Sequence, residues 1–467
     1  MRAGRADADS HRSDRTNEES VMTYRRDGRR LYDRVRRGIP AVATAVTLLV
    51  VLAGCESLLD VESDPNEVPG DQLAQPSSFQ ARLVGTQADF FFAYDMASAW
   101  GGLFTDELID GTGFDEVDER RVTASNATIG AVDEAPEGLD GLWTPMQKAA
   151  FTSDLLQEDI LANSFPEQVP NPENSPELAL TSMIAGYAKL TLGEMFCTTA
   201  FGGDGPELSS QQTYALAEDE FTQAIDADNA TTDVLRAALV GRARARLLQG
   251  NTSGALSDAQ QVPVDWAFVA DVYSTNSQQE ENDLWNMLSD SQRFSVDPNY
   301  RALDIDATAE DDPRVEAFQD PDDQFASDGS TELFQLDKYI VATAPLVLAS
   351  GHEAAYYVAE IQGGQTAEDM INAVRDDIGD GGDDGDGRGQ GDLAAQDYDS
   401  SGDTAEEILL KVFDERARTL FLTGKRMGDL RRLLDQQGID LFPTGPNFGD
   451  QTCMPLPNAE RDNNPDL

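Results

Sequence analysis

Positive charge in this sequence is gathered in one short segment. Between residues 414 and 432 it reads DERARTLFLTGKRMGDLRR, with six Lys or Arg side chains, although the whole chain has a formal net charge of −52. Such a cluster could bind an anionic ligand, a nucleic acid or a membrane surface, or it could form ion pairs inside the fold. Apolar residues recur between the charges at helical spacing, and an unpaired charge at a buried face is costly. We therefore predict that these cations pair with acidic neighbours and hold a helical hairpin in place.

The net charge restricts the partners outside the fold. A strongly negative protein repels nucleic acid and anionic lipid, so we expect neither as a partner. Acids close to the cationic segment, namely Asp414, Glu415 and Asp429, and many others along the chain offer ion-pair partners inside it. Scaffolding is thus favoured over an anion-binding site.

Side chains arranged for catalysis or metal binding are scarce. His352 is the only histidine after Cys55, which argues against His-based triads and His-rich metal sites. The acidic run DDGD at Asp383–Asp386 could hold calcium, but its spacing misses the EF-hand pattern. A glycoside hydrolase needs two carboxylates at a set separation, and no local motif marks such a pair. We expect a protein without catalytic residues, metal or cofactor.

The first 54 residues have the features of an export signal. A basic run that ends at Arg37 precedes GIPAVATAVTLLVVLAGC, which is short for a membrane span and contains Pro40. The stretch ends in LAGC, which resembles the lipobox of bacterial lipoproteins, where the Cys thiol takes a diacylglycerol before cleavage. We predict a signal peptide over 1–54, lipidation of Cys55, and a true start at Met22 with a spurious extension before it. An ordinary signal peptide or anchor helix with an incidental Cys is the alternative.

Two other cysteines, Cys197 and Cys453, remain in the chain. Outside the cytoplasm two thiols can pair, and a disulfide that closes so long a loop would contribute about 4–5 kcal/mol in the chain-entropy model. Two separate buried thiols are the alternative, and the sequence leaves both open.

Helix pairs account for much of the remaining chain. The stretch DVLRAALVGRARARLLQGNTSGALSDAQQV contains an Ala-rich helix, a Gly-Asn turn and a shorter helix, so that two helices could approach closely. This resembles a tetratricopeptide helix pair, the unit of an α-solenoid. Residues 354–379 repeat the plan, with Thr366 expected to cap the second helix, and the cationic segment would form a third pair. The expected fold class is mostly α.

Local signals also mark helix starts and less regular regions. Ser175 before Pro176, and Thr404 three residues before Glu407, are typical helix N-termini. Periodicity fades after residue 262, where short strands are expected, and a later stretch is rich in Gly and Asp. The expected boundaries are 55–78 for an acidic tether, 79–467 for a single domain, 79–262 and 349–440 for its helical scaffold, 263–348 for its irregular region and 380–401 for a Gly/Asp loop.

The cationic segment also resembles a known family. The pattern ER-x3-LFL-x-GKR-x2-DLRR at Glu415–Arg432 is similar to the C-terminal signature of SusD/RagB-type nutrient-uptake lipoproteins. Other fragments occur in the order typical of that family. They are the lipobox, FGGDGP at Phe201–Pro206, the Ala-rich pair near Arg242, Asp312-Pro313-Arg314, Asp337-Lys338-Tyr339, Glu353 with Ala359-Glu360, Asn372-Ala373-Val374-Arg375 and MPLPNAERDNNPDL at Met454–Leu467. The chain departs from the family at Ala349-Ser350-Gly351, where an Arg is often present.

The resemblance implies a SusD-like fold and a role in nutrient uptake. It indicates a surface-exposed lipoprotein, held at the outer membrane by lipid alone, that acts as a lid on a SusC-like TonB-dependent transporter. Such a lid captures an oligosaccharide or another nutrient and passes it on, with helix pairs facing the transporter and irregular loops holding the ligand. In this family aromatic rings stack on sugars. The candidates here are Trp100, Trp266, Tyr273, Trp285 and Tyr300, each of which could instead be a core residue.

Two other functions compete with this one. A tetratricopeptide-type adaptor lipoprotein in outer-membrane assembly would have helix pairs throughout, contrary to the irregular region at 263–348. A surface glycoside hydrolase would need the carboxylate pair described above. The adjacent rings of Phe90, Phe91 and Phe92 are expected in a helix core rather than in a ligand site.

Overall fold

The computed structural model describes residues 75–112, 141–270, 273–276, 281–301, 303–305, 312–379, 393, 396–444 and 451–467. All of them belong to one compact unit, Val68–Leu467. The predicted signal peptide, Cys55, most of the tether and the calcium candidate Asp383–Asp386 lie outside the described residues. Within those residues, every helix is too short or too polar to cross a membrane.

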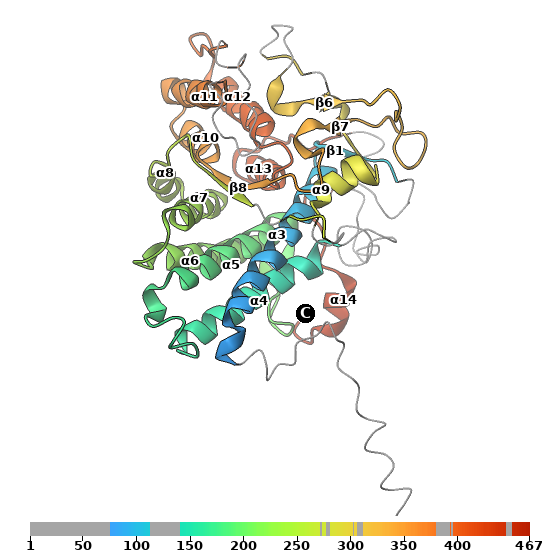
Figure 1. Ribbon diagram of the computed structural model, residues 1–467. Coiled ribbons are helices and arrows are strands. Elements are labelled where there is room, and N and C mark those ends of the chain that lie inside the picture. Colours follow the sequence, from blue (N-terminus) through green and yellow to red (C-terminus); the bar gives the residue numbers. More distant parts are fainter. Residues whose placement is uncertain are drawn as a thin grey trace, which may run out of the picture. The chain divides into compact units, whose positions relative to one another are not determined.

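Helices that follow one another in the sequence pack against each other, as Figure 1 shows. The first pairs are α3 (Phe79–Phe104) with α4 (Trp143–Leu161), α5 (Pro176–Met195) with α6 (Ser210–Asp226), and α7 (Thr232–Leu248) with α8 (Thr252–Ala259). The stack continues with α10 (Gly351–Gln362), α11 (Gly364–Gly379), α12 (Ala405–Thr419) and α13 (Arg426–Arg432). In it α10 contacts α7 and α8 on one side and α11 and α12 on the other. The prediction of a mostly α fold built from helix pairs is confirmed.

Two of the predicted helix starts are confirmed and one is wrong. The Ser175 hydroxyl accepts the Leu178 N–H at 3.0 Å at the start of α5, and Thr404 forms a capping box with Glu407 at the start of α12. Thr366 does not cap a helix, because α11 already begins at Gly364. The preceding turn uses positive φ angles at two consecutive glycines, which lets the helix restart without a polar cap.

Small residues bring the central helices together. The ring of Phe221 on α6 is 0% exposed and lies against Gly186 of α5 and Gly241 of α7. A methyl group at Gly186 would come within 2.7 Å of that ring, and one at Gly241 within 2.4 Å. Only glycine at both positions therefore allows three helices to close around one aromatic side chain.

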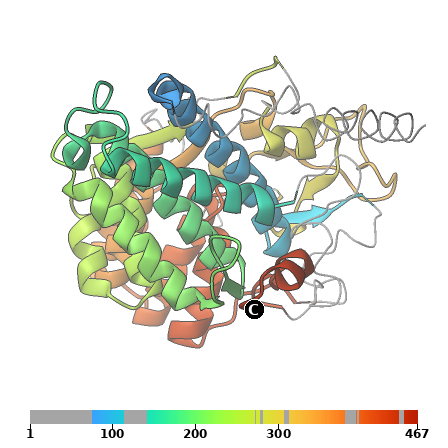
Figure 2. The same cartoon turned by 90° about the horizontal axis from the view of Figure 1, so that it is seen from below.

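Residues 263–348 form short elements rather than helix pairs. Here α9 (Asp283–Trp285) runs directly into a π-helical turn (Asn286–Asp290), and together they are called the 283–290 helix below. The strands form antiparallel pairs: β1 (Leu108–Asp110) with β5 (Phe294–Val296), β4 (Ala267–Ala270) with β8 (Leu346–Ser350), and β6 (Ala317–Phe318) with β7 (Gln335–Leu336). Figures 1 and 2 show α9 and β1 on the side of the helix stack away from α6, α7 and α8.

The remaining elements are short. A small antiparallel sheet joins β2 (Thr198–Thr199) to β3 (Leu208–Ser209), and α14 (Asn458–Asn463) lies near the C-terminus. A second π-helical turn follows α13 at Leu433–Gln437. Single 3₁₀ turns occur at Pro76–Ser78, Pro172–Asn174, Pro298–Tyr300, Pro313–Val315 and Asp337–Tyr339.

All six cations of the 414–432 segment have partners inside the fold. Lys425 and Arg431 donate to backbone carbonyl oxygens, which satisfies them without a carboxylate in contact. The other four pair with carboxylates: Arg416 with Asp429 at 2.9 Å, Arg418 with Asp312 at 3.0 Å and Asp414 at 3.1 Å, Arg426 with Asp106 at 2.6 Å, and Arg432 with Glu360. The prediction that these cations are internal scaffolding is confirmed.

A completely buried carboxylate lies at the centre of this scaffold. Glu415 on α12 is 0% exposed and contacts three cations. They are Arg314 at 2.7 Å, Lys411 at 2.8 Å and Arg375, which comes from α11 and donates to both carboxylate oxygens. Burial alone would raise the pKa of Glu415, but the three cations hold this pKa well below its usual range. The ionised carboxylate thus joins α11 and α12 to the turn that carries Arg314.

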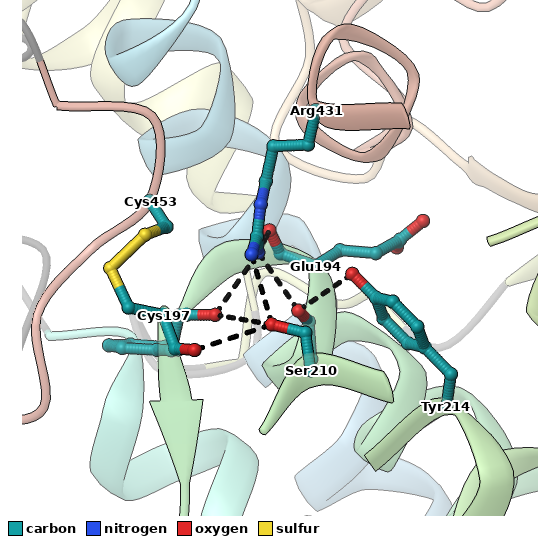
Figure 3. The surroundings of a disulfide bond; sticks show 8 residues. Glu194, Cys197, Ser210, Tyr214, Arg431 and Cys453 are labelled. Carbon is teal, nitrogen blue, oxygen red and sulfur yellow. Dashed lines mark hydrogen bonds between the residues drawn. A yellow bond between two sulfur atoms is a disulfide. The ribbon is translucent and has the colours of Figure 1, made fainter. Parts of the chain in front are cut away.

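The C-terminal segment is tied to the end of α5, as Figure 3 shows. A disulfide joins Cys197 to Cys453, with their Cα atoms 5.0 Å apart. Beside it the Cys197 N–H donates to the Met454 carbonyl at 2.8 Å. Arg431 of α13 reaches the same place and donates to three carbonyl oxygens at the end of α5 and to the Ser210 hydroxyl. Three distant segments therefore meet at one corner of the helix stack.

Replacing Glu415 with Gln should lower the free energy of unfolding by about 3–5 kcal/mol at pH 7, because two buried arginines and the partly exposed Lys411 would lose a charged partner. The pKa of Glu415 is depressed in the folded state, so its contribution is complete above the unfolded pKa of about 4.3 and is lost as the pH falls below it. The difference between Glu415→Gln and the parent should therefore shrink in acid. Urea unfolding at pH 7 and at pH 3 measures it.

The matched control for this experiment is Glu406→Gln. Glu406 is exposed on the same helix, and its substitution should change the free energy of unfolding by less than about 0.5 kcal/mol. Equal losses for the two variants would contradict the role assigned to Glu415.

Candidate functional site

The two tryptophans Trp100 and Trp266 are core residues. Trp100 on α3 is 2% exposed, and its ring packs edge-on against Phe294 of β5 with centroids 5.5 Å apart. Trp266 is 8% exposed, and its indole N–H donates to Asp233 of α7 at 3.0 Å. Both rings fasten a helix to the irregular region, so neither presents an open face on which a sugar could stack.

The two tyrosine candidates are buried in the same way. Tyr273 and Tyr300 are each 7% exposed, and burial raises the pKa of both well above its usual value. The ring of Tyr300 packs against Phe421, with centroids 4.6 Å apart. The irregular region covers the helices through such large apolar rings, which explains why its aromatics are mostly internal. The expectation of ligand contact now concerns Trp285 alone.

Trp285 differs from the other four candidates because it is partly exposed. It lies in the 283–290 helix, whose first turn is capped by the Asn282 side chain, which accepts the Trp285 N–H at 3.0 Å. Asn282 is itself fixed, since its side-chain amide donates to the Ala344 carbonyl at 2.9 Å. The position of this short helix is therefore set by buried polar contacts rather than by its own length.

The 283–290 helix forms one wall of a groove with a volume of about 650 Å³, although Trp285 itself is not among the residues that line it. The other walls are α3 and the first turns of α4. Sequence reasoning missed this site, because no local pattern marks three short stretches that meet only in the fold. The lining residues are Asp89, Phe92, Ala93, Met96, Thr144, Pro145, Lys148, Asp283, Asn286, Met287, Asp290, Ser291 and Arg293.

Phe92 shows why the sequence pattern failed here. It was expected in a helix core with its two neighbours, and Phe90 and Phe91 are indeed buried. Phe92 is only partly buried, lines the groove, and packs edge-on against Tyr273 with centroids 6.0 Å apart. Consecutive residues of a helix point in different directions, so Phe92 can face the groove while Phe90 and Phe91 face the core.

The groove combines apolar surface with hydrogen-bonding groups. Phe92 and Met287 supply apolar contact, while Asn286 and Ser291 supply an amide and a hydroxyl. Lys148 is paired with Asp89 at 2.8 Å across the two helices of the α3–α4 pair. A concave site with apolar walls and a few polar groups is typical of binding sites for small organic molecules.

One carboxylate beneath the groove has a strongly shifted pKa. Asp95 on α3 is 0% exposed and accepts the Asp283 N–H at 3.1 Å. Burial, and then the negative charge of Asp283, raise the pKa of Asp95 well above its usual value. Through its hydrogen bond to the Asp283 N–H, Asp95 holds the start of the 283–290 helix. Because it has no exposed surface, Asp95 cannot contact a ligand in the groove.

The placement of the tryptophans can be tested by fluorescence. Acrylamide should quench mainly Trp285, because Trp100, Trp143 and Trp266 are each at most 8% exposed. Trp285→Phe should therefore remove most of the quenchable emission, whereas the control Trp100→Phe should leave it unchanged. Loss of the quenchable component in the Trp100 variant instead would contradict the burial described here.

Comparison with solved structures identifies the fold. A SusD/RagB family protein from Bacteroides thetaiotaomicron matches with a TM-score of 0.59 at 14% identity, over 84% of this chain and 95% of that chain. A SusD-like carbohydrate binding protein from Bacteroides vulgatus matches with a TM-score of 0.53 at 12% identity, over 84% and 97% of the two chains. Surface glycan-binding protein A from Bacteroides uniformis matches with a TM-score of 0.54 at 13% identity, over 84% and 98%.

Sequence comparison alone gives no relative. No protein-family model matches the chain. No curated protein matches it either. The structural matches nevertheless extend across most of the chain to SusD/RagB family proteins, as the motifs around Glu415 predicted, and the chain has the SusD-like fold.

Proposed function

We propose that this chain is the ligand-capturing lipoprotein of an outer-membrane uptake system. It binds an oligosaccharide or a similar nutrient and passes it to a SusC-like TonB-dependent transporter. The observation that carries the proposal is the groove of about 650 Å³ built on a SusD-like fold. Two solved proteins with this fold are named as carbohydrate or glycan binders, which supports a glycan as the ligand.

The chemistry of the groove suits a sugar. A pyranose ring has apolar faces and a hydroxyl-bearing edge, so it needs both kinds of contact at once. Phe92 and Met287 offer apolar contact to the faces of the ring. Asn286, Asp290 and Ser291 offer hydrogen bonds to its hydroxyl groups. A hydrolase needs a carboxyl group of raised pKa in contact with its ligand. Asp95, the acid beneath the groove whose pKa is raised, has no exposed surface, which supports binding rather than hydrolysis.

The attachment to the membrane rests on the N-terminal sequence. The LAGC motif supplies Cys55 as the lipidation site, and several acyl chains on one cysteine give stable anchoring. The acidic stretch 55–78 then serves as a tether that lets the folded unit move over its transporter. A lid over an outer-membrane transporter would in this way lie at the cell surface.

A contact surface for the transporter is available on α4. Phe151 is 56% exposed and Leu155 is 41% exposed, and both line a small pocket of about 180 Å³ together with Phe201. Exposed apolar side chains that gather beside a pocket are a feature of protein interaction sites. We assign this part of α4 to the contact with the transporter.

Removing one polar group should weaken glycan binding measurably. Asn286→Ala should lower the affinity for a bound oligosaccharide by about threefold to tenfold, since one hydrogen bond from the groove wall is lost. Titration calorimetry against a panel of plant, algal and host polysaccharides provides the measurement. Gln168→Ala, at an exposed site that does not line the groove, is the control and should bind as the parent does. If Asn286→Ala binds the oligosaccharide as tightly as the parent protein does, the groove is not the ligand site.

A barrel of transporter size should accompany the lipidated protein when it is purified from its own outer membrane. The double change Phe151→Asp and Leu155→Asp should lose the barrel, because charges would be buried at the contact. Leu216→Asp, at a site 38% exposed on α6, is the control and should retain it. Circular dichroism confirms that both variants fold. Recovery of barrel-assembly components instead would support an adaptor, and hydrolysis of added glycan would support an enzyme.

A further inference from the structure

A loop beside the groove carries only negative charge. Residues 319–332 read QDPDDQFASDGSTE, with five acids and no Lys or Arg. Asp320, Asp322 and Asp323 are exposed. Glu332 has a cationic neighbour, Arg301 at 3.5 Å, so the uncompensated charge of this loop comes from its aspartates. The loop is called the acidic rim below.

Contacts to Gln292 and Gly111 fix the acidic rim in place. The Gln292 side chain donates to Asp323, and the Gln292 carbonyl accepts the Ser327 N–H at 2.9 Å. Gln292 lies between Ser291 and Arg293, and both of these line the groove. On the other side the Asp328 N–H donates to the Gly111 carbonyl at 2.8 Å. The loop is therefore attached at a residue that lies between two residues of the groove wall.

The groove itself adds to this negative potential. Lys148 and Asp89 form an ion pair at 2.8 Å and largely cancel each other. Among the other lining residues the charged ones are Asp283, Asp290 and Arg293, so acids outnumber cations. The wall and the rim thus have the same sign, and so does the chain as a whole, at −52.

We propose that the groove binds glycans that carry no carboxylate or sulfate groups and rejects anionic ones. This inference rests on the proposed function and narrows the class of its ligand. A uronate or sulfate that enters the groove meets the like charge of the lining acids and of the rim attached beside them. Over distances up to the Debye length, about 8 Å at physiological ionic strength, this repulsion is only partly screened. A neutral sugar meets no such repulsion, and its hydroxyl groups can donate hydrogen bonds to carboxylates that line the groove, such as that of Asp290.

A matched pair of ligands tests the proposal. Oligogalacturonate and its fully methyl-esterified form share one backbone and differ in charge. A sulfated galactan and its desulfated form make a second pair. For the pair whose backbone binds, calorimetry at low salt should give an affinity at least about tenfold weaker for the anionic member, and added salt should narrow the difference.

Reversing one charge on the rim gives a second readout. Asp322 is exposed and does not line the groove. Asp322→Lys should raise the affinity for the anionic member by about threefold to tenfold and leave the neutral member unchanged. The control Asp228→Lys makes the same change at an exposed position in the turn between α6 and α7, and it should alter neither affinity.

The outcomes separate this inference from the proposed function. Equal or tighter binding of the anionic member to the parent protein overturns the inference and leaves glycan capture intact. The same gain in anion affinity from Asp228→Lys as from Asp322→Lys also overturns it, because the effect would then belong to net charge and not to the rim. Absence of binding to every glycan of the panel overturns the proposed function, and the inference with it.

Discussion

The ionised carboxylate of Glu415 holds together parts of the chain that are far apart in sequence. Arg314 reaches it across 101 positions and Arg375 across 40. If one of the three segments moved alone, Glu415 would lose a cation and a buried arginine would lose its contact with Glu415, at a large electrostatic cost. The placement of α11 and α12, and of the turn that carries Arg314, follows from this one requirement for charge balance. The apolar faces of the helices supply the driving force, and the charges select one arrangement.

Local rules predicted the parts of the fold that depend on neighbours in sequence. Helix pairs, the Ser175 cap and the capping box at Thr404 all arise within a few residues, and the structure contains them. The cationic segment could be assigned to the interior from its helical spacing, yet most of its partners could not be named. Asp106 and Glu360 lie 320 and 72 positions from the arginines that they contact, and no spacing rule spans such a distance. Several of the family-like fragments that were recognised one by one in the sequence meet around these ion pairs in the fold.

The candidate site could be predicted only in outline. The irregular region was identified from its lost periodicity, but its aromatic residues are poor guides to ligand contact, because large rings are also what best fills the space between an irregular segment and a helix. Trp100 and Tyr300 serve that purpose here. Phe92 is the opposite case, because it was expected in the interior and instead lines the groove. The sequence does not show where a long helix leaves the core. Grooves arise from tertiary packing, so their walls are visible only once distant segments are placed.

The disulfide between Cys197 and Cys453 sets an order on maturation. It closes a covalent ring across a sequence separation of 256. As the polypeptide emerges, Cys197 must wait with a free thiol while α6 to α13, which lie inside the ring, are still being delivered. Oxidation can therefore close the ring only after all of those helices, and Cys453 behind them, have been synthesised. A thiol that waits this long is open to wrong partners, and Cys55, the third cysteine of the chain, would be a competing one.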